Sequence, residues 1–180
     1  MKEELEKVKC PDCGEFYIMR KGKKLLPCGK HPDKSYLTAI SRKGPSLPLM
    51  HVWEKYGPLD GFSVLDYGCG RGADVEWLRS QGVEVHGYDP HYAPEKPLGE
   101  FSVALCTYVL NVLDPEVAGM VIAKVMRHVK RGGVAFFTVR RDIKKEGFTS
   151  KGTQRWNVEL PFKVEKKTNK YCIYKVVKTW

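Results

Sequence analysis

The sequence has no long hydrophobic run and no repeat. No stretch of 18 apolar residues occurs, which argues against a membrane-spanning helix. The first nine residues, MKEELEKVK, are too charged for a secretory signal peptide. Without repeats or low-complexity tracts, 180 residues suit one well-buried domain with a small appendage. We therefore expect a cytoplasmic protein with no membrane partner.

Cysteine is present, but not in the pattern of a disulfide framework. Of the six cysteines, Cys69 lies in a glycine-rich turn and Cys106 in an apolar stretch that reads as a strand. Both positions suit free thiols, and this usage is typical of a reducing compartment such as the cytoplasm.

Basic residues outnumber acidic residues at both ends of the chain. The net charge of +10 divides into +5 for residues 1–50, −7 for residues 51–123 and +12 for residues 124–180. Basic flanks around an acidic middle favour a polyanionic partner, most simply nucleic acid. The alternative is a lysine-rich surface that serves solubility or thermal stability.

The most informative segment is residues 64–72, which read VLDYGCGRG. Its first residues look like the end of a buried strand, its three glycines make a tight turn, and residues 73–81 read as the following helix. A second strand at 83–88 ends in Asp89, 17 residues after Gly72. An acid at that place accepts hydrogen bonds from ribose hydroxyls in nucleotide-binding units of this kind.

The glycine spacing separates two classes of cofactor. Dinucleotide enzymes use G-x-G-x-x-G, with the helix N-terminus facing a pyrophosphate, and this chain lacks that spacing. Asp66, beside the glycines, would repel a pyrophosphate but suits an ammonium group. A nicotinamide or flavin cofactor and a ligand-free structural turn are the alternatives.

The same segment resembles the first motif of the class I S-adenosylmethionine (SAM)-dependent methyltransferases, V-L-D-x-G-C-G-x-G. SAM carries an ammonium, a sulfonium and a ribose but no phosphate, which matches the carboxylate of Asp66. The resemblance implies a cofactor site that contains the following residues: Asp66, Tyr67, Gly68, Cys69, Gly70, Asp89, Pro90, Thr107 and Tyr108.

The later elements follow the order of a class I, Rossmann-like α/β sheet over residues 62–180, after a linker and lead-in helix at 35–61. The predicted elements are a strand at 101–108, a helix from 115 to about 129, a turn at Arg131-Gly132-Gly133, a strand at 134–139, a basic loop at 140–157 and a hairpin of 160–166 with 171–177. Only 11 residues separate Asp89 from Phe101, so the sheet is expected to be shortened between its second and fourth strands. The resemblance normally places the adenine contacts in that gap.

The first 34 residues contain a pattern of metal ligands. Cys10-Pro-Asp-Cys13 and Cys28-Gly-Lys-His31 are separated by 14 residues, and two such pairs can surround one tetrahedral ion. We predict a structural zinc knuckle or ribbon over residues 1–34, with short strands near 16–18 and 24–26, because so short a segment rarely folds without a metal. The alternative is a loose arm with four unliganded side chains.

The end of the 101–108 strand holds the residues that the resemblance places nearest the reaction. Methyltransferases acting on exocyclic amines of bases carry Asn/Asp-Pro-Pro-Tyr/Phe there, whereas this chain has TYVLN at 107–111, without the prolines. Tyr108 and Asn111 are the catalytic candidates; their alternatives are an aromatic wall and a helix cap. His91 and Tyr92, after Asp89, are further candidates near the methyl group.

Basic residues supply the candidate substrate contacts. The predicted set consists of Arg42, Lys43, Arg140, Arg141 and Arg155. Phe148 and Trp156, within the basic loop, are candidates to stack on bases, or else to cover the core.

Four blocks in order resemble a narrower family, the methyltransferases associated with DNA phosphorothioation systems. The blocks are TAI-x-RK-x-x-S-x-P (38–48), VLDYGCGRG-x-DV (64–75), GYDP (87–90) and YVLNVL (108–113). The resemblance spans about residues 38–115 and implies a DNA-linked role, without fixing the methyl acceptor.

We therefore predict a SAM-dependent methyltransferase that acts on nucleic acid, DNA or RNA, by direct methyl transfer. Much of the catalysis in such an in-line displacement is positioning. Two other functions stay open: a small-molecule methyltransferase whose basic surface is incidental, and a non-catalytic nucleic-acid-binding protein with the same fold.

Overall fold

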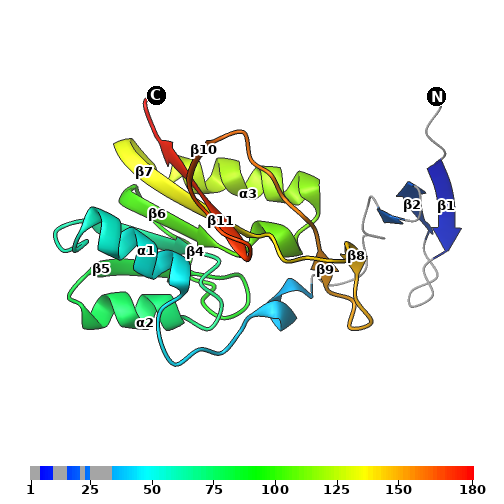
Figure 1. Cartoon of the computed structure of the whole chain (residues 1–180), viewed down its shortest axis with the longest axis horizontal. Coiled ribbons are helices and arrows are strands. Elements are labelled where there is room, and N and C mark those ends of the chain that lie inside the picture. The colour runs from blue at the N-terminus through cyan, green and yellow to red at the C-terminus, as the bar shows by residue number, and fades with distance from the viewer. Residues whose placement is uncertain (1–4, 10–15, 21–22, 25–33) are drawn as a thin grey trace.

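A computed structural model describes residues 34–180 in full and, before them, three short strands, β1 (Leu5–Lys9), β2 (Phe16–Arg20) and β3 (Lys23–Lys24). The main body is a mixed sheet with helices on its two faces (Figure 1). Its strands are β4 (Ser63–Tyr67), β5 (Glu84–Tyr88), β6 (Phe101–Thr107), β7 (Val129–Arg140), β10 (Lys163–Lys167) and β11 (Tyr171–Val177). The helices are η1 (Ser35–Thr38), α1 (Leu47–Tyr56), α2 (Ala73–Ser80), η2 (Leu110–Val112) and α3 (Pro115–Arg127).

The six strands of this sheet follow the order β10-β11-β7-β6-β4-β5. Strands β5, β4, β6 and β7 are parallel, β11 runs antiparallel to β7, and β10 runs antiparallel to β11. Because parallel strands end at one edge of a sheet, the segments that follow β4, β5 and β6 lie close together. The predicted Rossmann-like α/β sheet, with its antiparallel last strand, is confirmed.

The core forms two layers, one on each face of the sheet. Successive residues of a strand point to opposite faces, and in β6 Val103 and Leu105 pack with α1 and α2, whereas Ala104 and Cys106 pack with α3. Each helix contributes a buried stripe, which includes Leu49 and Val52 from α1, Val75 and Leu78 from α2, and Val121 and Val125 from α3. Helices therefore cover both faces and leave the C-terminal edge of the parallel strands to form the site.

The sheet ends at β5, as the short gap in the sequence predicts. After β5 the chain makes a single antiparallel bridge between Asp89 and Ala93 and then passes to β6 without a further strand or helix. Strand β5 is therefore an edge strand of this sheet.

Two predicted boundaries are wrong at the start of β7. Helix α3 ends at Arg127, and Arg131-Gly132-Gly133 lies inside the strand rather than in a turn. Gly132 has φ +79, and the pairing register with β6 shifts between Phe101 and Val103. The glycines therefore form an irregularity within a long strand, which a turn pattern in the sequence does not distinguish from a loop.

The first strands form a sheet of their own in the order β1-β2-β3. Strand β2 pairs with β1 and with β3, and β1 was not predicted. Residues 25 and 26 of the predicted second strand lie outside the described residues, so the ribbon stays a prediction. The four predicted zinc ligands, Cys10, Cys13, Cys28 and His31, lie outside the described residues.

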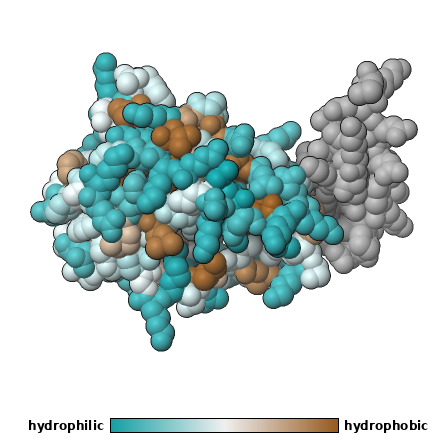
Figure 2. All heavy atoms as spheres, in the orientation of Figure 1, coloured by the Kyte–Doolittle hydropathy of each residue, from teal (hydrophilic) through white to brown (hydrophobic). Residues whose placement is uncertain are grey.

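No helix among the described residues has the length and apolar character needed to cross a membrane. The face of the molecule shown in Figure 2 is largely hydrophilic, with apolar residues distributed in small groups. The cysteines at 69, 106 and 172 are free thiols.

Candidate active site

The turn between β4 and α2 is built so closely that two of its residues have to be glycine. Gly68 has φ +80, and a Cβ placed on it would lie 2.3 Å from Cγ2 of Val109. Gly70 has φ +53, and a Cβ there would lie 3.3 Å from that of Ala39. A side chain at either position would therefore meet both backbone strain and its neighbours.

The turn is tied to the end of β5 by its backbone. The N–H groups of Gly68 and Cys69 donate to the carbonyl of Tyr88 at 2.7 and 3.0 Å. Burial raises the pKa of the Cys69 thiol to about 12, with smaller contributions from the carboxylates of Asp66 and Asp89. Cys69 is thus a neutral thiol at the site.

Asp66, the last but one residue of β4, is a buried carboxyl group. It is 3% exposed, and no hydrogen bond to its carboxyl group comes from the described part of the chain. Burial raises its pKa to about 8, the charge of Asp74 adds to the increase, Arg42 opposes it, and Asp89 adds a little more. Such a group binds a cationic partner well because it lacks solvent and protein donors.

Asp89, which follows the end of β5, accepts hydrogen bonds from three backbone N–H groups. Its Oδ1 accepts from His91 at 2.9 Å and Tyr92 at 3.0 Å, and its Oδ2 accepts from Gly70 at 3.1 Å. Since a carboxylate oxygen accepts two hydrogen bonds, Oδ2 retains capacity for a ligand hydroxyl. The next residue, Pro90, is exposed beside it.

The segment before α1 is locked onto the glycine turn. Asp74, buried in the first turn of α2, accepts from the backbone N and Oγ of Ser46 at 2.6 and 2.8 Å. It also forms an ion pair with Arg42, 3.3 Å from Nη2. These contacts join the 38–48 and 64–75 blocks of the sequence into one structure.

Aromatic rings lie beside Asp89. The rings of Tyr36 and His91 stack with centroids 4.0 Å apart, and the Tyr92 hydroxyl donates to the Tyr36 carbonyl at 3.1 Å. The Arg71 guanidinium lies over the Tyr92 ring, 4.9 Å from its centroid. This group joins η1 to the loop that follows β5.

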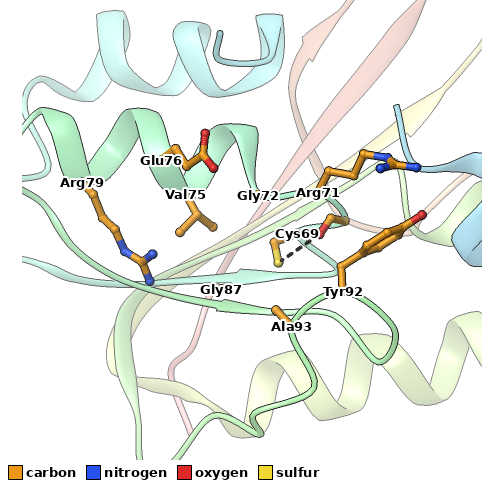
Figure 3. A pocket seen from close by; sticks show the side chains of 10 residues that line it. Cys69, Arg71, Gly72, Val75, Glu76, Arg79, Gly87, Tyr92 and Ala93 are labelled. Atoms are coloured by element: carbon orange, nitrogen blue, oxygen red, sulfur yellow. Dashed lines mark hydrogen bonds between the residues drawn. The ribbon is translucent and has the colours of Figure 1, made fainter. Parts of the chain in front are cut away.

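A cavity of about 350 Å³ lies between α2 and the end of β5 (Figure 3). Its lining residues are Cys69, Gly70, Arg71, Gly72, Val75, Glu76, Arg79, Gly87, Tyr92 and Ala93. Neither Asp66 nor Asp89 lines it. The cavity adjoins the glycine turn on the side of the sheet edge, where no strand follows β5.

The end of β6 carries the one non-glycine residue with positive φ in the described part of the chain. Tyr108 has φ +61, its N–H donates to the Thr138 carbonyl at 2.9 Å, and its side chain packs on the α1 and α2 side. Burial raises the pKa of its hydroxyl to about 12, the neighbouring Tyr171 adds to this, and Arg42 opposes it. Tyr108 is therefore a neutral phenol at physiological pH, and Thr107 precedes it, half-buried.

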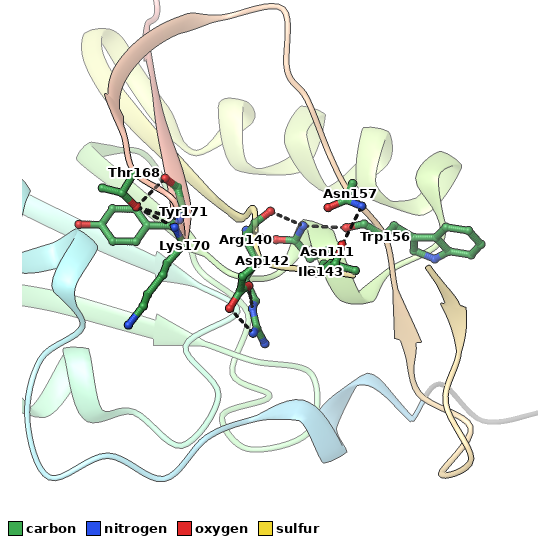
Figure 4. A network of polar contacts seen from close by, with 9 residues as sticks. All are labelled: Asn111, Arg140, Asp142, Ile143, Trp156, Asn157, Thr168, Lys170 and Tyr171. Atoms are coloured by element: carbon green, nitrogen blue, oxygen red, sulfur yellow. Dashed lines mark hydrogen bonds and ion pairs between the residues drawn. The ribbon is translucent and has the colours of Figure 1, made fainter. Parts of the chain in front are cut away.

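Asn111 is fully buried, and its amide group is engaged at both ends (Figure 4). Its Oδ1 accepts from the backbone N of Arg140 at 2.6 Å, and its Nδ2 donates to the carbonyl of Trp156 at 2.8 Å. The backbone N–H of Trp156 in turn donates to the backbone carbonyl of Asn111 at 2.8 Å. These bonds hold the two ends of the basic loop together beside Tyr108.

The basic loop is an ordered hairpin. Strands β8 (Gly147–Phe148) and β9 (Gln154–Arg155) pair in it, and hydrogen bonds between Thr149 and Thr153 close its tip. Trp156 is 7% exposed, and its indole N–H donates to Oε1 of Gln154 at 3.0 Å, whereas Phe148 is 43% exposed.

The predicted substrate contacts differ in how they are engaged. Arg140 forms a bidentate ion pair with Asp142 at 2.8 and 2.9 Å, and the Arg141 side chain donates to the Thr168 carbonyl. Lys43 and Arg155 are exposed and form no ion pair within residues 34–180. The same holds for the three lysines of the hairpin, Lys144, Lys145 and Lys151.

The sequence matches the family of the methyltransferase domain over residues 20–168, which is more than half of the chain. The chain belongs to this family. It is a SAM-dependent methyltransferase. A comparison with curated protein sequences found no match.

Solved structures share the fold of this methyltransferase at low sequence identity. The Burkholderia thailandensis 1,6-didemethyltoxoflavin-N1-methyltransferase, with 1,6-didemethyltoxoflavin and S-adenosylhomocysteine bound, has a TM-score of 0.57 and 19% identity over 74% of this chain and 77% of its own. The Synechocystis PCC 6803 magnesium protoporphyrin IX methyltransferase has a TM-score of 0.53 and 15% identity over 73% of this chain and 80% of its own. The T. thermophilus 16S rRNA N2 methyltransferase RsmC, in complex with AdoMet and guanosine, has a TM-score of 0.50 and 19% identity over 97% of this chain and 50% of its own.

The residues of this methyltransferase fit SAM at the glycine turn. Asp66 has a buried carboxyl group that accepts no hydrogen bond from the described residues and so matches an ammonium, and the free capacity of Asp89 matches a ribose hydroxyl. Tyr67, by contrast, is buried in the α3 layer, where its ring lies 4.9 Å from that of Tyr88.

Sequence reasoning missed the contacts that Asp74 and Ser46 make in this methyltransferase. A signal was present, because Ser46 precedes the Pro48 of a helix start and so reads as an N-cap, and its hydroxyl does accept from Leu49. Its partner across 28 residues could not be read from spacing.

Proposed function

We propose that this protein transfers the methyl group of SAM to nucleic acid. The observation that carries the proposal is the basic hairpin at residues 140–157, which Asn111 anchors beside Tyr108. Its exposed cations, which form no ion pair within residues 34–180, are Lys144, Lys145, Lys151 and Arg155. Exposed cations on an ordered hairpin suit phosphate groups, which supply most of the affinity of proteins for nucleic acid.

The glycine turn is the proposed cofactor site. Asp66 would hold the ammonium group, Asp89 would accept from a ribose hydroxyl, and the backbone of Gly68 to Gly70 would lie against the ligand. SAM, when bound, supplies both the methyl group and the leaving group. The tasks of the protein at this end are to bind and to orient.

Tyr108 and Asn111 receive different roles in this proposal. Tyr108 is the wall of the acceptor site, and its raised pKa makes it a hydrogen-bond donor rather than a base at neutral pH. Asn111 is a positioning residue, because its amide group already serves Arg140 and Trp156. Its position in the sequence suits a catalytic amide, but its contacts favour a positioning role.

Two finer proposals come from the sequence. DNA is the proposed acceptor polymer, on the resemblance of residues 38–115 to the methyltransferases of DNA phosphorothioation systems. A structural zinc ion, held by Cys10, Cys13, Cys28 and His31, is proposed for the N-terminal segment. Elemental analysis of the purified chain would contradict the zinc proposal if it found no zinc in a folded preparation made with zinc.

The test of function is methyl transfer from radiolabelled SAM to separate pools of duplex DNA, single-stranded DNA, RNA, protein and small solutes. We expect label in a nucleic-acid pool. Label confined to small solutes would replace the proposal by a small-molecule methyltransferase. Binding of DNA or RNA without affinity for SAM would replace it by a non-catalytic binding protein.

A matched pair of variants locates the contact surface. Four substitutions to Gln in the hairpin (Lys144, Lys145, Lys151 and Arg155) should weaken nucleic-acid binding and reduce the slope of log affinity against log salt by about 3. A control with the same change of charge elsewhere carries Lys96→Gln, Lys124→Gln, Lys163→Gln and Lys167→Gln, and should keep most of the slope. Equal losses in both variants would show diffuse attraction rather than a contact surface.

A further inference from the structure

Arg42 has a buried nitrogen without a partner. Its Nε is shielded from solvent and forms no hydrogen bond within the described residues. A buried, unsatisfied donor of this kind costs about 1–3 kcal/mol, so it calls for an explanation. One explanation is a ligand acceptor that completes the site.

The ion pair with Asp74 does not satisfy this guanidinium. The Oδ1 of Asp74 accepts a hydrogen bond from the backbone N–H of Ser46, and its Oδ2 accepts one from the Ser46 hydroxyl. The closest approach of Arg42 to Asp74 is that of Nη2 to Oδ1, at 3.3 Å, and Nε stays without a partner among the described residues. Asp74 therefore holds the guanidinium in place while most of its five N–H donors stay available.

The position of Arg42 is the second observation. Its charge acts on Asp66, at the glycine turn, and on Tyr108, at the end of β6. The segment that carries it crosses the turn, since Ala39 packs against Gly70. Arg42 is therefore close enough to both the proposed ammonium site and the acceptor wall for its charge to act on each, and its segment lies against the glycine turn.

Two other arginines near the site are less suitable than Arg42 for binding a small anion. Arg140, the other cation that acts on Tyr108, is held by both oxygens of Asp142. Arg71 lies over the Tyr92 ring, beside Asp89.

We propose that Arg42 binds the α-carboxylate of the cofactor's amino-acid moiety, opposite the α-ammonium held by Asp66. This inference rests on the proposed SAM site and moves Arg42 from the substrate contacts, where the sequence placed it, to the cofactor. A planar guanidinium suits a carboxylate because it can donate two parallel hydrogen bonds. The ammonium of the amino-acid moiety would then meet Asp66, and its carboxylate would meet Arg42. These two residues lie 24 positions apart in the sequence, and the contacts of Asp74 hold the segment of Arg42 against the glycine turn.

The test compares two ligands that differ in the amino-acid moiety. Calorimetry would measure the Kd of S-adenosylhomocysteine, which has the carboxylate, and of 5′-methylthioadenosine, which lacks the amino-acid moiety. Arg42→Gln should weaken S-adenosylhomocysteine roughly 10- to 100-fold and change methylthioadenosine less than about twofold. Lys43→Gln, the neighbouring exposed cation, is the matched control and should change neither ligand.

The outcomes separate this inference from the proposed function. Equal losses for both ligands in Arg42→Gln would overturn the inference and leave the cofactor site standing, because the arginine would then act only on the shape of the site. Wild-type protein that binds neither ligand would overturn the proposed site and the inference with it. If Arg42→Gln does not fold, Arg42→Lys gives the same comparison, with an intermediate loss expected for S-adenosylhomocysteine alone.

Discussion

The cofactor side and the acceptor side of the site are formed by different kinds of residue. On the cofactor side, glycines with positive φ and backbone N–H groups shape the turn, and buried acids surround it. On the acceptor side, a single buried amide anchors a hairpin of exposed cations. Charge segregates in the same way, because residues 51–123 carry −7 and residues 124–180 carry +12.

This difference matches the different ligands that the two sides bind. A cofactor with an ammonium and a sulfonium binds in a small, acidic and rigid place, so its contacts have to be short. A polyanion meets a wide, exposed surface, where charge at a distance is enough. A change on the cofactor side should therefore act on folding and affinity together, whereas a change on the acceptor side should act on the acceptor alone.

The largest effect is expected from a methyl group on the glycine turn. Gly68→Ala places a Cβ 2.3 Å from Val109 at φ +80, and we expect a loss of about 3 kcal/mol in stability and of measurable SAM binding. Gly147→Ala, in the hairpin, is the matched control, because φ is +106 there but nothing lies within 4 Å. It should cost about 1 kcal/mol and leave SAM binding intact. Urea unfolding and calorimetry measure both, and equal costs would erase the contrast between the two sides.

The next effect concerns the acid at the end of β5. Asp89→Ala should weaken SAM binding roughly 10- to 100-fold, because a charged acceptor for a ribose hydroxyl and for three backbone N–H groups is lost. Asp89→Asn keeps an oxygen for the N–H groups of His91 and Tyr92, so it should fold as the wild type does and still bind SAM more weakly. Unchanged affinity in the alanine variant would rule out the ribose contact.

A substitution that removes a contact on the acceptor side should leave the affinity for the cofactor unchanged. Asn111→Ala removes the bonds to Arg140 and Trp156 and should cost about 2 kcal/mol in stability. The KM for the nucleic acid should rise several-fold, while the Kd for SAM stays within about twofold. A loss of SAM affinity equal to the loss in KM would show that Asn111 serves both sides.

Sequence could predict the cofactor side because its constraints are local. The three glycines, Asp66 and Asp89 lie on consecutive elements, and the resemblance to class I methyltransferases implied the order of the strands. The gap between Asp89 and Phe101 also showed that no strand follows β5, and the structure agrees. Such features are determined by spacing, which a sequence shows directly.

The remaining parts depended on distant pairs, which spacing does not reveal. Asp74 meets Ser46 across 28 residues, and Asn111 meets Trp156 across 45. The glycine pair at 132–133 suggested a turn, yet the long-range pairing of β7 with β6 and β11 made it part of a strand. A residue type can predict a contact of this kind, but only packing identifies the partner.

The smallest effect tests the acid that faces the proposed ammonium. Burial, with help from Asp74, raises the pKa of Asp66 to about 8, so the free protein keeps this proton at pH 6.5. An ammonium favours the ionised form, and the proton has to leave on binding. The affinity for S-adenosylhomocysteine should therefore rise about fivefold from pH 6.5 to 7.5 and level off near pH 8, where the ligand's own α-amino group begins to lose its proton. Asp66→Asn should bind more weakly, with no rise over the same range, and a rise that persists in this variant would assign the proton to another group.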